Sequence, residues 1–232
     1  MNKLLEIGID EFRKSWQKDM AEIPEGKQIR AGGRPTKAMP FGEDGTWWQA
    51  QGQAYIQSWI TWRQQNPNLH ILTMEDGQPA IELGVVADVQ VDDGEVIQLK
   101  GYIDRVFVDA NTGEVLIVDL KTGKNTPMAM QLGFYKRALK AAYGIDAQYG
   151  AYWMAREGTL GGVENLDAYT DEVIDYWVAK TYAGVKNEIF LPHVTAMCKG
   201  CGVKQHCYVF NPDTKFSPIN MKNASMQEVE ND

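Results

Sequence analysis

The sequence predicts an α/β fold, because segments typical of strands and of helices follow one another along the middle of the chain. Two strand-like segments, residues 80–91 and 95–108, are joined by the turn Asp92-Asp93-Gly94. A third, residues 114–120, contains a short apolar run and comes after a turn that ends at Gly113. We expect all three to be strands.

Helical segments accompany these strands. Residues 127–143 are expected to form a helix, since Pro127 is favoured in a first helical turn and Gly144 is typical of a helix end. A further strand-like segment, residues 147–155, follows it. The other helices are expected at residues 4–19, 47–65 and 168–187.

The second of these helices carries an aromatic stripe. Alternating steps of four and three separate Trp48, Gly52, Tyr55, Trp59 and Trp62, which places them on one helix face. Such a stripe usually packs into a core. The alternative is a surface on which nucleic-acid bases stack.

Composition limits the function classes. The chain has 232 residues, 44% of them hydrophobic and seven of them Trp, which allows a substantial core and excludes disorder as the main state. It has no apolar run long enough for a transmembrane helix, and acidic residues near its start do not fit a signal peptide, so we expect a cytoplasmic protein. The net charge of −8 argues mildly against nucleic acid, although a local positive site matters more for binding a phosphate than a positive total.

We divide the chain into four parts. Residues 1–46 hold the first helix and a long loop, and residues 47–188 form the core with the candidate site. Residues 189–210 are a cysteine segment that we expect to bind metal, and residues 211–232 are expected to be a flexible tail.

Charged side chains lie at the ends of two expected strands. Asp104 stands in GYIDRV, and Asp119 and Lys121 follow the apolar run at 115–118. Residues two apart on a strand point to one face, so Asp119 and Lys121 project together. Charges at the end of a buried strand need partners. A divalent cation shared by the aspartates, and a phosphate on the lysine, would provide them, which predicts phosphodiester hydrolysis.

Two further polar residues fit the same cleft. Gln131 and Tyr135 are four apart on the expected helix, hence on one face. Plainer interpretations exist for the charged residues, because Asp104 with Arg105, or Asp119 with Lys121, could be a simple ion pair. The joint order and spacing favour a metal site.

All three cysteines, Cys198, Cys201 and Cys207, lie within ten residues. An odd, clustered number is poor material for disulfides, whereas Cys-x2-Cys-x5-Cys is typical of zinc or iron–sulfur ligands. His193 or His206 is the candidate fourth ligand. The alternative is three unligated thiols in a loop.

The motifs Gly-x-x-Asp, apolar-Asp-x-Lys-Thr-Gly and Gln-x-x-x-Tyr, in this order, resemble the RecB-like branch of the PD-(D/E)XK nuclease superfamily. The terminal cysteine spacing is similar to that of the iron–sulfur subset, which includes AddB-type helicase-nucleases, CRISPR-associated exonucleases and their phage relatives. The resemblance covers roughly Glu82 to Cys207.

The resemblance implies a restriction-endonuclease-like core, with a mixed central sheet flanked by helices and a tail pinned by metal. It implies Asp104 and Asp119 as ligands of Mg²⁺ or Mn²⁺, and Lys121 as the catalytic lysine. Gln131 and Tyr135 would support DNA and the site. The implied function is that of a DNA exonuclease in phage or bacterial recombination, repair or processing. Its expected partner is DNA, with recombination or replication proteins as further candidates.

The sequence departs from this family in two places. The family has Gly-x-x-x-His on its first core helix, where this chain has Gly52 followed by Ile56. Glu82 is a candidate replacement for that metal ligand. The family's fourth cysteine is also missing, which leaves an iron–sulfur cluster as the expectation and Zn²⁺ as the alternative. The missing histidine keeps a second function open, that of a non-catalytic DNA-binding or assembly module.

Overall fold

A computed structural model describes residues 3–23, 37, 40, 42–91, 94–124, 127–189, 193–195, 198, 200–207 and 209–210. The chain divides into two units, Met1–Ala179 and Lys180–Asp232, and each is described by itself. No described helix has the length and apolar character that crossing a membrane requires. The predicted flexible tail, residues 211–232, lies outside the described residues.

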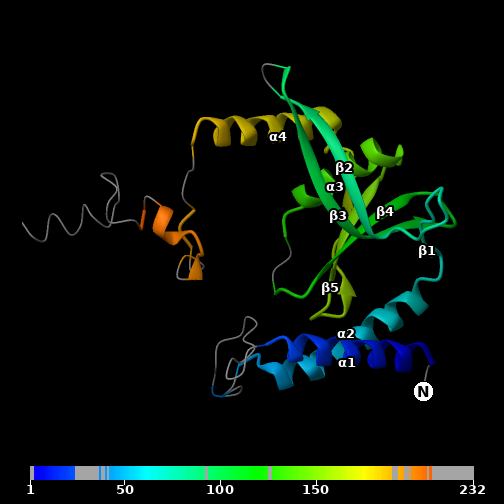
Figure 1. Ribbon diagram of the computed structural model, residues 1–232. Coiled ribbons are helices and arrows are strands. Elements are labelled where there is room, and N and C mark those ends of the chain that lie inside the picture. The colour runs from blue at the N-terminus through cyan, green and yellow to red at the C-terminus, as the bar shows by residue number, and fades with distance from the viewer. Residues whose placement is uncertain are drawn as a thin grey trace, which may run out of the picture. The chain divides into compact units, whose positions relative to one another are not determined.

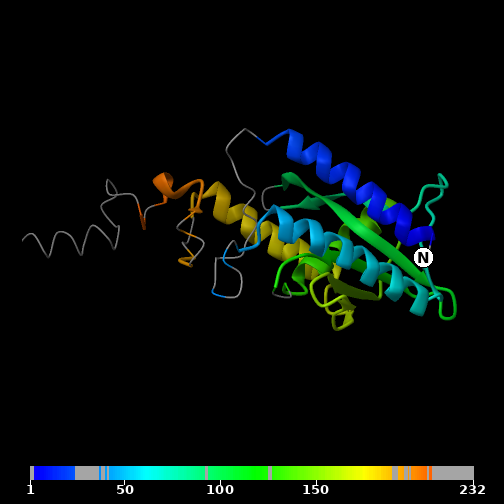
Figure 2. The same ribbon diagram turned by 90° about the horizontal axis from the view of Figure 1, so that it is seen from below.

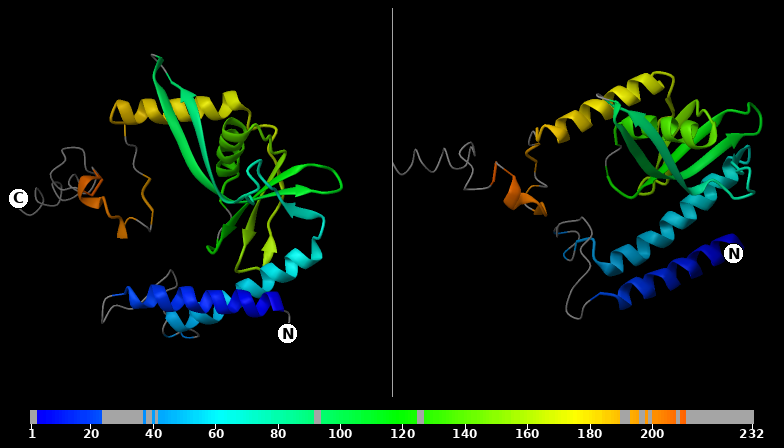
Figure 3. Two further views of the ribbon diagram at one scale, coloured as in Figure 1. Left: turned by 45° about the vertical axis from the view of Figure 1, so that its right-hand side comes forward. Right: turned by 45° about the horizontal axis from the view of Figure 1, so that its top comes forward.

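The first unit is built on one mixed, seven-stranded sheet. Its longest strand, β3 (Val96–Asp109), pairs antiparallel with β1 (Leu69–Ile71), β2 (Ile81–Gln90) and β4 (Val115–Lys121). In turn β4 pairs in parallel with β5 (Tyr149–Met154), and β5 pairs antiparallel with the short β6 (Thr159–Leu160) and β7 (Glu164–Asn165). The four longer strands confirm the prediction. β2 and β3 form a long hairpin, and the sheet is strongly curled (Figures 1 and 3).

The four α-helices of the described part are α1 (Lys3–Ala21), α2 (Gly45–Gln65), α3 (Met130–Tyr143) and α4 (Asp171–Lys186). The predicted end of α3 is confirmed, because Gly144 caps it in the left-handed conformation, with φ 69°. Its predicted start at Pro127 is wrong. The Met128 carbonyl accepts a hydrogen bond from the Tyr152 hydroxyl at 2.8 Å, which holds this segment on β5 ahead of the helix.

Helices cover both faces of the sheet. On one face, α3 contributes Leu132 and Leu139 to a core with Ile103, Val106 and Ile117. On the other, aromatic residues of α2 pack on a second core of sheet residues, and the ring centroids of Trp59 and Trp62 lie 5.1 and 5.2 Å from that of Trp153. The core interpretation of the aromatic stripe is therefore confirmed for Tyr55, Trp59 and Trp62.

The helices α1 and α2 run side by side in opposite directions (Figures 2 and 3). Gly52 of α2 lies directly against the Phe12 ring, in the space that a Cβ would need. One turn further, Ile56 of α2 contacts Gly8 of α1, where a Cβ would lie 2.9 Å from Ile56 Cγ2. Glycine on each helix thus permits the close approach.

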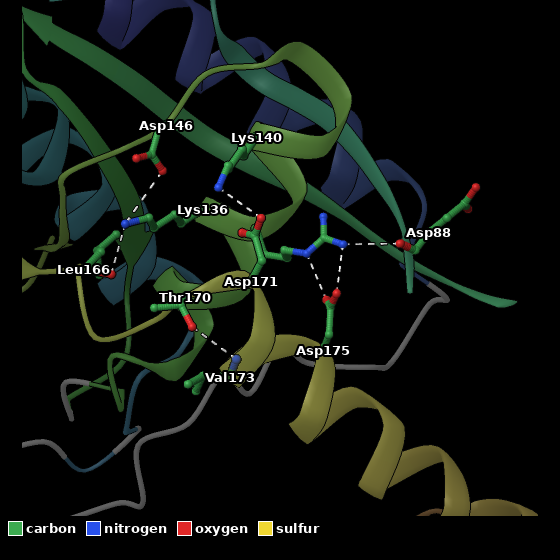
Figure 4. Close-up of polar contacts among 10 residues, drawn as sticks. Asp88, Lys136, Lys140, Asp146, Leu166, Thr170, Asp171, Val173 and Asp175 are labelled. Atoms are coloured by element: carbon green, nitrogen blue, oxygen red, sulfur yellow. Dashed lines mark hydrogen bonds and ion pairs between the residues drawn. The ribbon is translucent and has the colours of Figure 1, made fainter. Parts of the chain in front are cut away.

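Ion pairs attach the first turns of α4 to α3 (Figure 4). Arg137 donates through Nε and Nη2 to the two carboxylate oxygens of Asp175, at 2.8 and 3.0 Å. Lys140 Nζ lies 3.0 Å from Asp171 Oδ2. A third Arg137 bond reaches the carbonyl of Asp88 on β2, which ties the hairpin to the same group.

Candidate active site

The strand β3 switches faces at Asp104. Ile103 and Val106 both lie in the core under α3, although residues three apart on a regular strand point to opposite faces. The pairing with β2 stays in register across this point, with Leu83 opposite Ile103 and Ile81 opposite Arg105, so the strand changes faces without an inserted residue. The Asp104 carboxylate turns toward β4, and its Oδ2 accepts a hydrogen bond from the amide of Leu120 at 2.6 Å.

Asp119 is almost fully buried, at 2% exposure, and the described side chains that contact its carboxylate through hydrogen bonds or an ion pair are all predicted site residues. Its Oδ1 accepts from Gln131 Nε2 at 3.2 Å and from the Tyr135 hydroxyl at 3.3 Å. Gln131 Nε2 also donates to the Tyr135 hydroxyl oxygen at 2.8 Å. Asp119 Oδ2 lies 2.5 Å from Lys121 Nζ. Because Asp119 is buried, its ion pair with Lys121 is not a simple surface ion pair.

The environment of Asp119 disfavours its charged form. Burial raises the pKa of Asp119 above its ordinary value; the ion pair with Lys121 opposes that rise, and the charge of Asp104 adds to it. The pKa of Tyr135 is also raised, first by burial and then by the two aspartates. Asp104 therefore lies close enough for its charge to act on both residues.

These residues fit a divalent cation. A cation between Asp104 and Asp119 would relieve the repulsion and the burial that raise the pKa of Asp119. Asp104 Oδ1 has no hydrogen-bond partner among the described residues and is available as a ligand. Mg²⁺ usually keeps several waters and takes one or two protein carboxylates, which is the donor set present.

The glycine of the Gly-x-x-Asp motif has a packing role. A Cβ on Gly101 would lie 3.4 Å from Tyr135 Cε1, so the absence of a side chain allows the Tyr135 ring to lie against β3. This contact brings the Tyr135 hydroxyl to Asp119.

Sequence reasoning missed a buried ion pair beside this site. Glu43, 3% exposed, accepts from Arg156 Nη1 and Nη2 at 3.0 and 2.9 Å, and Lys124 Nζ lies 3.5 Å away. The hydrogen bonds from Arg156 lower the pKa of Glu43. Arg156 Nε also donates to the carbonyl of Thr122 at 2.7 Å, so the pair holds the segment that follows Lys121. The two residues are 113 positions apart, and no local pattern connects them.

The structure places Glu82, the predicted replacement for the missing histidine, with its side chain exposed and directed to Arg105. The side chain of Glu82 is 67% exposed, and its Oε1 lies 3.6 Å from Arg105 Nη1. Glu82 also has a left-handed backbone, with φ 48°, directly opposite Asp104 in the β2–β3 pairing. No third His, Cys, Asp or Glu joins the two aspartates in the described part of the chain, so the geometry gives the Glu82 prediction no support.

The cysteines of the second unit do not form a ligand set. Cys198 and Cys207 are partly exposed and Cys201 is exposed, and all three are free thiols. Cys198 Sγ accepts from the Thr195 amide at 3.3 Å. Of the described residues, which include both candidate histidines, none are gathered into a group of three or more that could hold a metal. The structure therefore does not show the predicted metal-pinned tail.

The family model of the PD-(D/E)XK nuclease superfamily matches residues 9–208. The chain belongs to this superfamily. Its members are usually nucleases and typically use Mg²⁺ or Mn²⁺, in agreement with the donor set described above. The mixed sheet between helices is consistent with the fold of the superfamily.

A phage relative agrees with this assignment. The chain is 32% identical over 167 residues to the Gene 69 protein of Mycobacterium phage D29, and the match covers 68% of this chain but only 58% of that protein. A solved structure, the crystal structure of SSO0001, is similar with a TM-score of 0.40 and 13% identity, covering 90% of this chain and 98% of the other.

Proposed function

We propose that this member of the superfamily is a divalent-metal-dependent DNA exonuclease of the RecB-like branch. The observation that carries the proposal is Asp119, a buried carboxylate that contacts Lys121, Gln131 and Tyr135. Its pKa is raised by burial and, to a lesser extent, by the charge of Asp104. Strongly perturbed groups with specific partners cluster at functional sites.

The residues of the site have different roles in the proposed reaction. Asp104 and Asp119 would hold the ion, which would supply a more acidic water and positive charge for the phosphate. The Lys121 ammonium is within 2.5 Å of Asp119 Oδ2, in position to orient the attacking water or to stabilise the pentacovalent phosphate. Gln131 and Tyr135 fix the rotamer of Asp119 through its Oδ1.

One observation favours the alternative of a non-catalytic DNA-binding or assembly module. The position that carries a histidine in the family is Ile56, which contacts Gly8 of α1. The described residues supply two carboxylates and no third ligand. Metal affinity would therefore depend more on water and substrate phosphate than in a site with the family histidine.

A nuclease assay separates the two functions. Purified protein is incubated with Mg²⁺, Mn²⁺ or EDTA and with end-labelled linear DNA or covalently closed circular DNA. We expect metal-dependent loss of linear DNA only. Cleavage of circles would refute the exonuclease assignment, and no cleavage with either metal would favour the module.

Lys121→Ala is the decisive variant. It is expected to reduce cleavage by a factor of about 10² or more, the range for losing one proton-transfer or charge-stabilising group, while the protein stays folded. Lys140→Ala is the matched control, because Lys140 pairs with Asp171 at the start of α4. Cleavage by Lys121→Ala at the wild-type rate would remove the assignment.

We also propose a structural metal centre at Cys198, Cys201 and Cys207, an iron–sulfur cluster with Zn²⁺ as the alternative and His193 or His206 as fourth ligand. The spacing of the three cysteines supports this centre, and their thiols are accessible. Metal binding would stabilise the fold of this irregular segment. Protein purified without oxygen should be brown. Colourless protein with stoichiometric zinc would select the alternative, and metal-free protein that melts at the holo temperature would refute a structural role.

The setting we propose is phage or bacterial DNA recombination, repair or processing in the cytoplasm. Its support is the similarity to a phage protein. Recombination or replication proteins are the proposed partners besides DNA.

A further inference from the structure

The outer face of the β2–β3 hairpin is bare. Beyond Phe107, the sheet face that α2 covers continues onto the hairpin, where no described helix packs on it. Odd-numbered residues such as Gly101 and Ile103 point to α3 in this part of β3, so even-numbered residues point to the bare face. Tyr102 lies on this face and is 70% exposed.

Tyr102 stands opposite a strand glycine. The β2–β3 register pairs it with Gly84, and a Cβ on Gly84 would lie 3.5 Å from Tyr102 Cε1, with no other described side chain within 4 Å. A glycine inside a strand marks a bulge, a bend or the close approach of a ligand. The neighbouring pair is Val86 and Lys100, and Val86 is 43% exposed.

One lysine of this face is available to contact a phosphate. Lys100 is exposed and forms no ion pair with the described residues. The nearest acid further out on the face is Asp88, whose Oδ1 accepts from Gln98 Nε2 at 3.2 Å. Tyr102 precedes Asp104 by two residues, about 7 Å along the strand.

We propose that Tyr102, with Gly84 and Lys100, forms a stacking site for an unpaired base of the DNA strand that enters the active site. Base stacking needs an exposed aromatic face and an open surface, and a nearby lysine provides the phosphate contact. The substrate class is therefore single-stranded DNA or an unpaired end. The inference rests on the nuclease function proposed above.

The same geometry has a structural interpretation, because an aromatic residue opposite a strand glycine stabilises the sheet. Tyr102→Val separates the two, since valine keeps the β propensity and removes the ring face. Tyr102→Phe retains the ring. Tyr176→Val on α4 is the matched control, because Tyr176 is 59% exposed on another element.

The test measures binding without chemistry. Full-length variants are titrated against a fluorescent single-stranded oligonucleotide, and against its blunt duplex, by anisotropy in EDTA, with melting temperatures alongside. Tyr102→Val should bind the single strand about tenfold more weakly, the effect of losing one stacked base, while Tyr102→Phe and Tyr176→Val bind as wild type. Lys100→Ala should flatten the dependence of the single-strand affinity on salt.

Failure of this inference is distinguishable from failure of the nuclease proposal. Unchanged single-strand binding by Tyr102→Val, or an equal loss on the duplex, overturns the stacking site even if wild type cleaves DNA. Weakened binding by Tyr102→Val in a protein that cleaves no DNA supports the stacking site and refutes the nuclease proposal.

Discussion

The Asp104 carboxylate accepts a hydrogen bond from the backbone amide of Leu120, the residue directly after Asp119. One oxygen of the first candidate ligand therefore fixes the strand that carries the second. This side-chain contact ties β3 to β4 at the point where β3 changes faces. Asp104 thus has a structural role beside the metal-binding role that we propose for it.

The two roles of Asp104 can be separated by substitution. Asp104→Asn keeps an acceptor for the Leu120 amide and removes the charge, so we expect normal folding with cleavage lost. Asp104→Ala removes the acceptor too, and should lower the free energy of unfolding by about 1 kcal/mol more than the asparagine. Urea unfolding of both proteins checks this, and equal stabilities would show that the hydrogen bond contributes nothing.

Asp119 makes the metal-free protein sensitive to pH. Because its folded pKa is raised above the ordinary 3.8, this group destabilises the folded state increasingly as pH rises from about that value through the raised pKa. The free energy of unfolding of wild type minus that of Asp119→Asn, measured in EDTA, should fall over this interval and then level off. Mn²⁺ should raise the wild-type value at neutral pH and leave the variant unchanged. A difference that grows with pH would contradict the cause assigned here.

The buried pair of Glu43 and Arg156 predicts the opposite pH dependence. The lowered pKa of Glu43 contributes stability that is present above its ordinary value of 4.5 and is lost as pH falls through the lowered pKa. Arg156→Ala leaves a buried carboxylate without its main partner, and should cost about 3 kcal/mol at neutral pH, the low end for such pairs because Arg156 is partly exposed.

A surface pair provides the control for Arg156. Lys14 pairs with Asp10 and Glu11 on α1, where all three side chains are more than 60% exposed, so Lys14→Ala should leave the unfolding free energy nearly unchanged. Glu43→Gln should remove the acid-side loss of stability. Comparable losses for Arg156→Ala and Lys14→Ala would mean that burial does not strengthen the pair.

Four of the site residues predicted from sequence form two pairs with local spacing. Asp119 and Lys121 share a strand face, and Gln131 and Tyr135 share a helix face, so the period of each element brought them together. The pairing of Glu43 with Arg156 depends on where α2 begins relative to β5, which no local pattern encodes. The change of faces at Asp104 could not be predicted for the same reason, since it shows only in the core that Ile103 and Val106 share.

The fold was predictable where elements are long and periodic. The strands β2, β3 and β4 and all four helices carry clear patterns, whereas β1, β6 and β7 have two or three residues and exist only through pairing with β3 or β5. The start of α3 was misplaced because the Tyr152 contact with Met128 overrides the preference of Pro127 for a first turn.

Gly52 shows how a motif position can serve packing. In the family pattern this glycine precedes a metal-binding histidine by four residues, but here it receives the Phe12 ring of α1. Gly52→Ala gains helix propensity of about 1 kcal/mol and yet places a methyl group inside that ring, so the free energy of unfolding should fall by about 1–3 kcal/mol overall. Thermal unfolding measures the change.

The neighbouring Ile56 supplies the matching test of function. Because Ile56 contacts Gly8, introducing the family histidine as Ile56→His should place an imidazole in the interface of α1 and α2, where it destabilises the protein without raising its affinity for Mn²⁺. For Gly52→Ala, the control is Gly162→Ala, since no described atom lies within 4 Å of the Cβ that it would add. Adding Phe12→Leu to Gly52→Ala should recover part of the loss, because the two residues share one contact and their effects are not additive. Tighter Mn²⁺ binding by Ile56→His would show instead that α2 can turn this position toward Asp104 and Asp119.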